Sequence, residues 1–236
     1  MPLIDFHTHI LPEVDDGSAS VAQSIAMLQK EAEQGICRVV ASPHFYPHRE
    51  TPERFLAKRR ISAEHLQAEM EKTSGLPEVF LGAEVYFFEG ISDCEFLREM
   101  AIEGTDYVLI EMPMKPWSER HLRQLVEIRH KLELTPIIAH LDRYIRPFHT
   151  QGILERLTDL PVLIQANAAF FSGWTRPLAL RLFKEGKIHL LGSDCHNLDT
   201  RPPDMETAIR ALTKAYGKSA LAQINRLEEK ILAQLS

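Results

Sequence analysis

The sequence predicts an α/β fold in which parallel strands close into a barrel. Three observations support this prediction. The 236 residues are enough for one α/β barrel, a fold that commonly takes about 200–250 residues. Short apolar runs alternate with longer stretches of helical periodicity. Side chains that bind metals or catalyse reactions follow nearly every apolar run. We therefore expect residues 1–236 to form a single domain.

Seven apolar runs have the length and composition of buried strands. They are Leu3–Phe6, Cys37–Ser42, Val79–Glu84, Tyr107–Glu111, Thr135–His140, Val162–Ala166 and Ile188–Ser193. Strands separated by helices are joined by right-handed crossovers and lie parallel. An open doubly wound sheet would also use this pattern, but it would gather reactive residues at one switch point. Their spread over nearly all the strand ends favours the barrel.

Five stretches between these runs have helical spacing of apolar residues. They are Ser20–Gln34, Arg54–Lys72, Glu119–Leu132, Arg176–Glu185 and Met205–Tyr216. Ser20 and Gln23 have the spacing of a capping box at the first helix. Gly35 and Gly186 stand where two helices are expected to end.

Composition limits the classes of function. The 27 Lys and Arg residues against 33 Asp and Glu residues give a net charge of −6, which argues against a nucleic-acid partner. No apolar run approaches the roughly 18–20 residues that cross a bilayer, so we expect no direct membrane insertion. The N-terminal residues show no signal-peptide pattern. Three cysteines without a CxxC pair suit a reducing compartment, and we expect a cytoplasmic protein.

His7 and His9 form a potential metal-binding pair at the end of the first strand. Alternation places both side chains on one face, about 7 Å apart along the strand. Two imidazoles in this arrangement can turn toward one ion. The pair alone is also compatible with two polar residues at a strand edge.

Five other strands also end in ligand-type residues, which favours a metal centre over unrelated buried groups. A buried carboxylate costs several kcal/mol unless it is paired or bound to a metal. Glu84 or Glu111 alone would suggest a structural ion pair, but six strand ends with such residues indicate a shared site. The residues at these five ends are His44, Glu84, Glu111, His140, Asp194 and His196.

Asp16 completes the predicted set, and the sequence favours it over Asp15 as a ligand. Five histidines and four carboxylates exceed the needs of one tetrahedral ion. We therefore expect two or three divalent ions that share bridging carboxylates. Nitrogen and oxygen ligands without thiolate suit Mn, Fe or Zn.

Arg143 and Arg201 are candidates to bind a phosphate group. Arg143 follows His140 by three residues, and Arg201 follows His196 by five. A guanidinium in the loop after a ligand-bearing strand can hold two phosphoryl oxygens at once. The alternative for either arginine is a solvated surface charge.

Residues 195–201 match the Cys-x5-Arg spacing of cysteine-dependent phosphatases, but we reject this site. A phosphate cradle needs consecutive inward-pointing N–H groups, usually with glycines. The intervening residues include no glycine and one acid, Asp199. Cys195 is therefore expected to be a small packed residue.

Together these motifs resemble the PHP (polymerase and histidinol phosphatase) superfamily. More narrowly, they resemble the CpsB/CapC-type bacterial manganese-dependent protein-tyrosine phosphatases. The most specific part is the string from His7 to Gly17, His-Thr-His-Ile-Leu-Pro-Glu-Val-Asp-Asp-Gly. The resemblance implies a distorted (β/α)7 TIM-like barrel, the PHP fold, with three metal ions, and manganese is the favoured metal. It also implies phosphotyrosine hydrolysis on a bacterial tyrosine kinase, whose C-terminal tail is the expected substrate, in capsule or exopolysaccharide synthesis.

The resemblance also implies how the ligands are shared. The first ion would be held by His7, His9, Glu84 and Asp194, the second by Glu84, Glu111 and His140, and the third by Asp16, His44 and His196. Arg143 and Arg201 match the family's phosphate-binding arginines. The expected mechanism is in-line attack on phosphorus by a hydroxide that bridges metal ions.

Other readings of the same residues stay open. A histidinol-phosphate phosphatase or a TatD-like deoxyribonuclease would use a similar scaffold, as would an amidohydrolase-type deaminase or lactonase. A metal-stabilised binding protein without turnover is a further alternative. Several aromatic side chains near the strand ends are candidates to flank a substrate ring: Phe45, Tyr46, Phe87, Phe88, Trp117, Phe170, Phe171 and Trp174.

Overall fold

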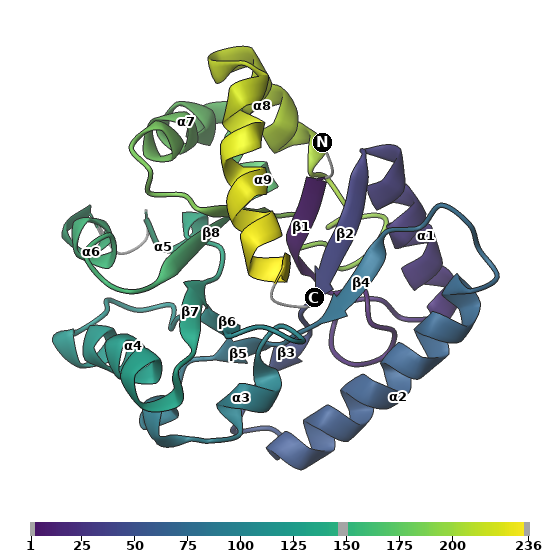
Figure 1. Cartoon of the computed structure of the whole chain (residues 1–236), viewed down its shortest axis with the longest axis horizontal. Coiled ribbons are helices and arrows are strands. Elements are labelled where there is room, and N and C mark those ends of the chain that lie inside the picture. Colours follow the sequence, from purple (N-terminus) through teal and green to yellow (C-terminus); the bar gives the residue numbers. More distant parts are fainter. Residues whose placement is uncertain (1–2, 146–150, 234–236) are drawn as a thin grey trace.

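A computed structural model describes residues 3–145 and 151–233. Its strands follow one another along the chain with helices between most of them (Figure 1). The strands are β1 (Leu3–Thr8), β2 (Ile36–Ala41), β3 (His44–Phe45), β4 (Glu78–Leu81), β5 (Glu84–Tyr86), β6 (Tyr107–Glu111), β7 (Thr135–Ile138), β8 (Leu163–Asn167) and β9 (Leu190–Gly192).

The strands form a closed ring. One sheet has the order β1-β2-β4 and the other β3-β5-β6-β7-β8-β9, and the neighbours within them are parallel. The two sheets join where β1 meets the residues after β9, through a parallel bridge between Thr8 and Cys195. If β2 is counted with β3, and β4 with β5, the ring has seven members. The predicted α/β barrel is confirmed.

The predicted strand Val79–Glu84 is wrong in one respect, because the chain forms two short strands there. β4 ends at Leu81 and β5 begins at Glu84. The neighbouring strand breaks at the same level, between β2 and β3, where Pro43 lacks the N–H that a continuous ladder needs. The Gly82 N–H donates to Ala41 and the Glu84 N–H donates to Pro43, so both breaks are bridged by hydrogen bonds.

Helices surround the ring (Figure 1). The five predicted helices are present within two residues of their expected ends. They are α1 (Val21–Glu33), α2 (Pro52–Met70), α4 (Glu119–Leu132), α7 (Arg176–Lys184) and α8 (Glu206–Tyr216). The sequence did not predict α3 (Leu97–Met100), α5 (Asp142–Ile145), α6 (Gln151–Leu157) or α9 (Lys218–Leu232), nor the short 3-10 turns η1 (Ile91–Asp93), η2 (Ala168–Phe171) and η3 (Gly173–Thr175).

Local signals set the ends of α1. The Ser20 hydroxyl accepts from the Gln23 N–H at 3.2 Å, as expected for an N-cap. The Gln23 side chain accepts from the Ala19 N–H rather than from Ser20, so only half of the predicted capping box forms. Gly35 follows α1 with φ 81°, a conformation that costs other residues free energy.

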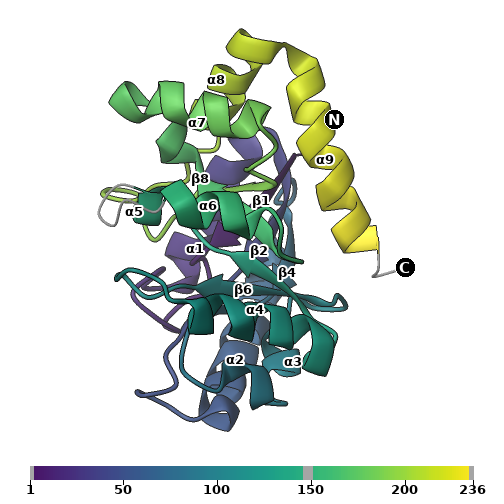
Figure 2. The same cartoon turned by 90° about the vertical axis from the view of Figure 1, so that its left-hand side faces the viewer.

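Helix α9 closes one end of the barrel. Ile231 and Leu232 belong to the same buried cluster as inward-facing residues of six strands. Figures 1 and 2 show α9 crossing this end, while α5, which follows β7, lies on the opposite side. The strand members of the cluster are Ile4 and Phe6, Val40, Phe80, Leu109, Ile137 and Leu190. The predicted metal centre is expected at the opposite end of the barrel, at the carboxyl ends of the strands. No helix in the described ranges has the length and apolar character needed to cross a membrane.

Candidate metal centre

The structure brings the nine predicted metal ligands together at the carboxyl ends of the strands. His7 lies in β1, His44 begins β3, Glu84 begins β5 and Glu111 ends β6. His9, Asp16, His140, Asp194 and His196 lie in the loops that follow β1, β7 and β9. Eight of the nine are buried, and Asp16 is 71% exposed.

Glu84 is the centre of the cluster. Its Oε2 lies 3.1 Å from His7 Nε2 and 2.9 Å from His44 Nδ1, and its Oε1 lies 2.7 Å from His140 Nε2. Burial opposes ionisation of this carboxyl, but His7 and His140 outweigh it and lower the pKa of Glu84 well below its ordinary value. A fully buried, ionised carboxylate among histidines is suited to bridge two cations.

Asp194 joins the histidine pair of β1 to both predicted arginines. Its Oδ1 lies 3.7 Å from His7 Nε2, 3.4 Å from His9 Nε2 and 2.6 Å from an Arg201 nitrogen. Its Oδ2 accepts from Arg143 and, at 2.9 Å, from Asn167 Nδ2. Burial acts against ionisation, yet His7, His9 and Arg143 lower the pKa of Asp194 well below its ordinary value.

Asp16 and Glu111 lie at the margins of the cluster. Asp16 Oδ1 is 3.7 Å from both His44 Nε2 and His196 Nε2. Glu111 Oε1 is 3.7 Å from His140 Nε2, and burial next to Glu84 raises the pKa of Glu111. Burial, His9 and Arg201 lower the pKa of His196 to about 3, which leaves its ring neutral and able to bind a metal.

The polar atoms of the cluster fit divalent cations better than they fit one another. His7 Nε2 and His9 Nε2 lie 3.1 Å apart, although two neutral ring nitrogens hydrogen bond only if one carries the proton. Among the residues that the structure describes, His196 Nε2 and Glu111 Oε2 are buried without a hydrogen-bond partner. Four overlapping triplets bring their ligand atoms within 4.8 Å: His9/His44/His196, His7/His9/Asp194, Asp15/Asp16/His44 and His44/Glu84/Glu111.

Backbone geometry explains how the ligands reach the centre. His140 and Asp194 have φ values of 32° and 56°, so the backbone turns away from the strand direction at these two predicted ligands. Gly192 permits close packing between β9 and β1, because a Cβ at this position would lie 2.6 Å from His7 Cβ. Gly192, two residues before Asp194, is therefore constrained by the packing of β9 against the strand that carries His7.

Three residues that the sequence did not assign to the site make hydrogen bonds to predicted ligands. Asp15 Oδ2 contacts His9 Nδ1 at 2.7 Å, and Gln165 Oε1 accepts from the His140 N–H at 2.6 Å. Asn167 donates to Asp194, as described above. Gln165 and Asn167 alternate at the end of β8, so two buried polar residues in an apolar strand were an available signal.

The Cys195 side chain packs against Glu31 rather than in the cluster of predicted ligands. This side chain is fully buried, and Sγ lies 3.9 Å from Glu31 Oε1. Burial and Glu31 raise the pKa of the thiol well above its ordinary value. The N–H groups of Asp199, Thr200 and Arg201 donate to the Asn197 side chain, so this loop does not form a phosphate cradle.

Most of the aromatic candidates are core residues. Phe45, Phe87, Trp117, Phe170 and Phe171 are buried. Phe88 stacks on Phe96 with ring centroids 6.2 Å apart, and Trp174 is 69% exposed. Tyr46 is half-buried, and its ring lies 5.1 Å from that of His44. Tyr46 therefore has a ring contact to a predicted ligand.

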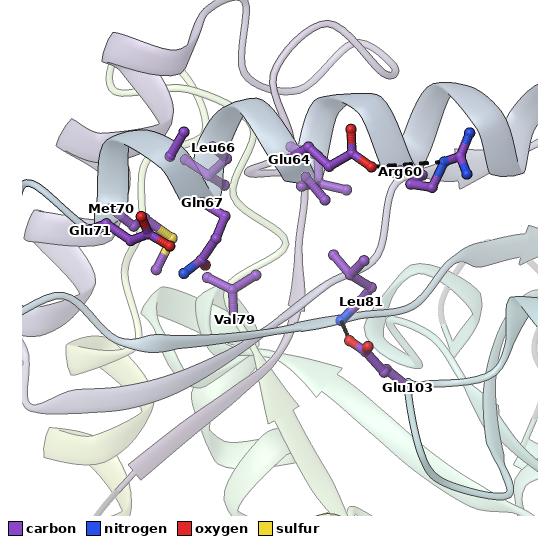
Figure 3. A pocket seen from close by; sticks show the side chains of 12 residues that line it. Arg60, Glu64, Leu66, Gln67, Met70, Glu71, Val79, Leu81 and Glu103 are labelled. Atoms are coloured by element: carbon purple, nitrogen blue, oxygen red, sulfur yellow. Dashed lines mark hydrogen bonds and ion pairs between the residues drawn. The ribbon is translucent and has the colours of Figure 1, made fainter.

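Two of the cavities next to helix α2 differ in character. One, of about 400 Å³, includes Asp16 and His44 in its wall. The other, of about 460 Å³, lies between α2 and β4, where Leu66, Val79 and Leu81 face it (Figure 3). The lining of the second cavity contains none of the nine predicted ligands, so it is separate from the metal centre.

Comparison with known proteins decides the family. The model of the family described as "Capsular polysaccharide synthesis, CpsB/CapC" matches residues 3–232. The chain belongs to the CpsB/CapC family. The resemblance predicted from the motifs is thereby confirmed over nearly the whole chain.

Relatives named tyrosine-protein phosphatases align over 79–91% of their own length. The tyrosine-protein phosphatase CpsB of Streptococcus pneumoniae is 29% identical over 226 residues, which cover 91% of each chain. The tyrosine-protein phosphatase YwqE of Bacillus subtilis is 28% identical over 237 residues, which cover 98% of this chain and 91% of YwqE. The putative tyrosine-protein phosphatase CapC of Staphylococcus aureus is 29% identical over 208 residues.

Solved structures agree with this assignment. Crystal structures of YwqE and CpsB, described as metal-dependent tyrosine phosphatases, include a chain that matches with a TM-score of 0.85 and 26% identity, covering 98% of this chain and 95% of that one. A lactonase from Listeria monocytogenes has a TM-score of 0.55 at 12% identity and shares the fold alone. A CpsB/CapC fold is therefore a variant of a barrel that other hydrolases also use.

Proposed function

We propose that this chain is a metal-dependent phosphatase that hydrolyses phosphotyrosine in proteins. One observation carries the proposal: the buried cluster of ligand-type residues shares Asp194 with two arginines. The cluster suits cations, and the arginines suit phosphoryl oxygens. The names of its relatives CpsB and YwqE support phosphotyrosine as the substrate.

Three divalent ions would be held by the residues that the motifs assign. His7, His9, Glu84 and Asp194 would hold the first, and Glu84, Glu111 and His140 the second. Asp16, His44 and His196 would hold the third. Manganese is favoured, while the mixed nitrogen and oxygen donors also suit Fe or Zn. When bound, such ions lower the pKa of water and neutralise charge on phosphoryl oxygens.

The side chains of the chain itself orient the substrate. Arg143 in α5 and Arg201 in the loop after β9 both donate to Asp194, which places the two guanidinium groups beside the cluster. Guanidinium groups placed in this way bind phosphoryl oxygens in pairs. They would stabilise the charge that develops there during the reaction. The phenol of tyrosine has a pKa of about 10. Its phenolate therefore leaves more readily than an alkoxide, so the reaction depends less on a general acid.

The expected partner is the C-terminal tail of a bacterial tyrosine kinase in capsule or exopolysaccharide synthesis. The family description supports the role in capsule synthesis, and the names of CpsB and CapC support a phosphotyrosine protein as substrate. The kinase tail is what the family resemblance implies. A reaction on such a tail would take place in the cytoplasm. The net charge of −6 does not favour nucleic acid as an alternative substrate.

Metal analysis combined with turnover tests the proposal. The purified protein is assayed on a phosphotyrosyl peptide, a phosphoseryl peptide and histidinol phosphate, before and after chelation and after Mn²⁺ is restored. We expect phosphotyrosine to be preferred, activity to fall with metal content, and Mn²⁺ to recover it. Full activity in metal-free protein would refute the metal mechanism, and preference for histidinol phosphate would refute the substrate assignment.

A further inference from the structure

The cavity next to Asp16 and His44 is a potential binding site for part of the substrate beyond the phosphoryl group. Its volume is about 400 Å³, which is within the range of ligand sites. It begins at two residues proposed to hold the third ion and extends toward α2. Its lining residues are Val14, Asp15, Asp16, His44, Tyr46, Arg49, Glu50 and Lys58.

Most charged side chains in this cavity already have a partner within the protein. Asp15 contacts His9 at 2.7 Å, and Glu50 pairs with Lys58 at 3.0 Å. Asp16 faces His44 and His196, the residues with which it would bind an ion. Asp15 and Glu50 are therefore paired within the protein, and the ion proposed at Asp16 would neutralise the third carboxylate of the wall.

Arg49 differs from these residues. Its side chain is exposed, and among the residues that the structure describes no carboxylate lies within ion-pair distance of it. The Arg49 Cζ lies 4.5 Å from the centroid of the Tyr46 ring, and the Arg49 N–H donates to the Tyr46 carbonyl at 2.9 Å. A backbone turn and a cation–π contact thus position the guanidinium, which stays available for an ion pair.

Tyr46 ties the position of this charge to the metal centre. Its ring packs 5.1 Å from His44 on one side and 5.7 Å from Tyr86 on another. Because Tyr46 is half-buried in this aromatic cluster, Arg49 is oriented before any ligand arrives. An oriented donor loses less conformational entropy when it binds than a free surface arginine does.

We infer that Arg49 binds the carboxylate of an acidic residue next to the phosphotyrosine of the substrate. The inference rests on the proposed function. An extended peptide advances about 3.3–3.6 Å per residue, so the neighbours of a residue that reacts at the cluster lie beside it, where this cavity opens. The phosphoryl group already has Arg143 and Arg201, which leaves Arg49 for a second anion. Guanidinium and carboxylate match as a two-pronged pair.

The test compares two phosphotyrosyl peptides that differ only in having Glu or Gln on both sides of the phosphotyrosine. We expect the metal-loaded protein to prefer the Glu peptide by about two- to fivefold in kcat/KM, the range of a partly exposed ion pair. Arg49→Ala should bring this ratio close to one. Arg49→Lys should retain part of it, and the preference should weaken as salt is added.

Arg54→Ala is the matched control. Arg54 is an exposed cation in the first turn of α2, five residues from Arg49 and outside the cavity lining. Its removal changes the net charge equally, so the peptide ratio should stay that of the unmodified protein.

Three results would overturn the inference. One is an equal rate for both peptides with the unmodified protein, and another is an unchanged ratio in Arg49→Ala. The third is an equal loss of activity on both peptides and on p-nitrophenyl phosphate, which would place Arg49 on the phosphoryl group. If neither peptide is hydrolysed by the metal-loaded protein, the proposed function itself fails and the inference fails with it.

Discussion

The carboxylate of Asp15 lies 2.7 Å from Nδ1 of His9 and so fixes the ring whose Nε2 faces Glu84 and Asp194. The same carboxylate accepts from the His44 N–H at 2.8 Å. Asp15 therefore positions two of the predicted ligands, one in the loop after β1 and one at the start of β3, although it is not itself among the nine. Burial opposes its ionisation, but contact with His9 lowers the pKa of Asp15 below its ordinary value, so it stays an acceptor.

Asp15→Asn should lower metal content and turnover together. The amide removes the charge that orients His9, and loss of such a partner typically costs about 10- to 100-fold in metal affinity or activity. Metal content by mass spectrometry and kcat/KM at limiting Mn²⁺ measure the effect. Asp199→Asn, at an exposed position, serves as the control. Normal metal affinity in Asp15→Asn would show that the His9 contact is dispensable.

Arg143→Ala and Arg201→Ala should each lower kcat/KM by about 10²-fold while metal content is retained, because each removes a donor to the phosphoryl group. Lysine should rescue only partly, since it offers a point charge rather than a planar pair of donors. The double variant should lose less than the product of the single losses, because both arginines share Asp194. Unchanged kinetics in both single variants would assign these arginines to the surface.

Cys195→Ser should keep most of its activity. The thiol is buried against Glu31 and its pKa is raised, whereas a nucleophilic thiolate would need a lowered one. Thiol alkylation of the folded protein should also have little effect. The rates of the serine variant and of alkylated protein, together with a search for phosphocysteine, check this. Abolished turnover at full metal content would show that the Cys195 thiol is the nucleophile.

Glu228→Gln should stabilise the protein at neutral pH and reduce the dependence of stability on pH. Glu228 is buried in α9, and burial together with Asp5 raises its pKa well above the ordinary value. Between the unfolded and folded pKa values the folded state binds the additional proton, so stability falls as pH rises through this window. Glutamine carries no proton to lose. Thermal midpoints from pH 5 to 8 measure the slope, and a slope equal to that of the unmodified protein would exclude Glu228 as its source.

The predicted strands are present and the predicted ligands lie close together in the fold, because both predictions depend on a local pattern. A buried strand reads as an apolar run, and a ligand at its end interrupts that run with His, Asp or Glu, as in Ile138-Ala139-His140. The same pattern cannot show the break at Pro43 as two strands, because β3 has two residues and owes its pairing to β5. Tertiary contact, rather than local sequence, creates that strand.

Helix α9 and the residues behind the ligands were harder to predict for a related reason. Glu228 and Asn225 lie on the buried face of α9, so polar residues interrupt the apolar stripe that would indicate a packed helix. Gln165 acts on His140 across 25 residues, and no spacing in the sequence connects them. Gly192 is needed because of His7, a residue near the opposite end of the chain. Such relationships exist only once the ring has closed.

The bridge between Thr8 and Cys195 has a consequence for biosynthesis. One edge of β1 pairs with β2, and the other pairs only with the residues that follow β9. During translation this second edge therefore stays unpaired until about four-fifths of the chain has left the ribosome. His7 and His9 likewise meet Asp194 and His196 only then. Under the proposed function, binding of the first ion would therefore follow synthesis of nearly the whole chain. A nascent chain stalled before residue 190 would have neither a finished barrel nor all the residues proposed to hold that ion.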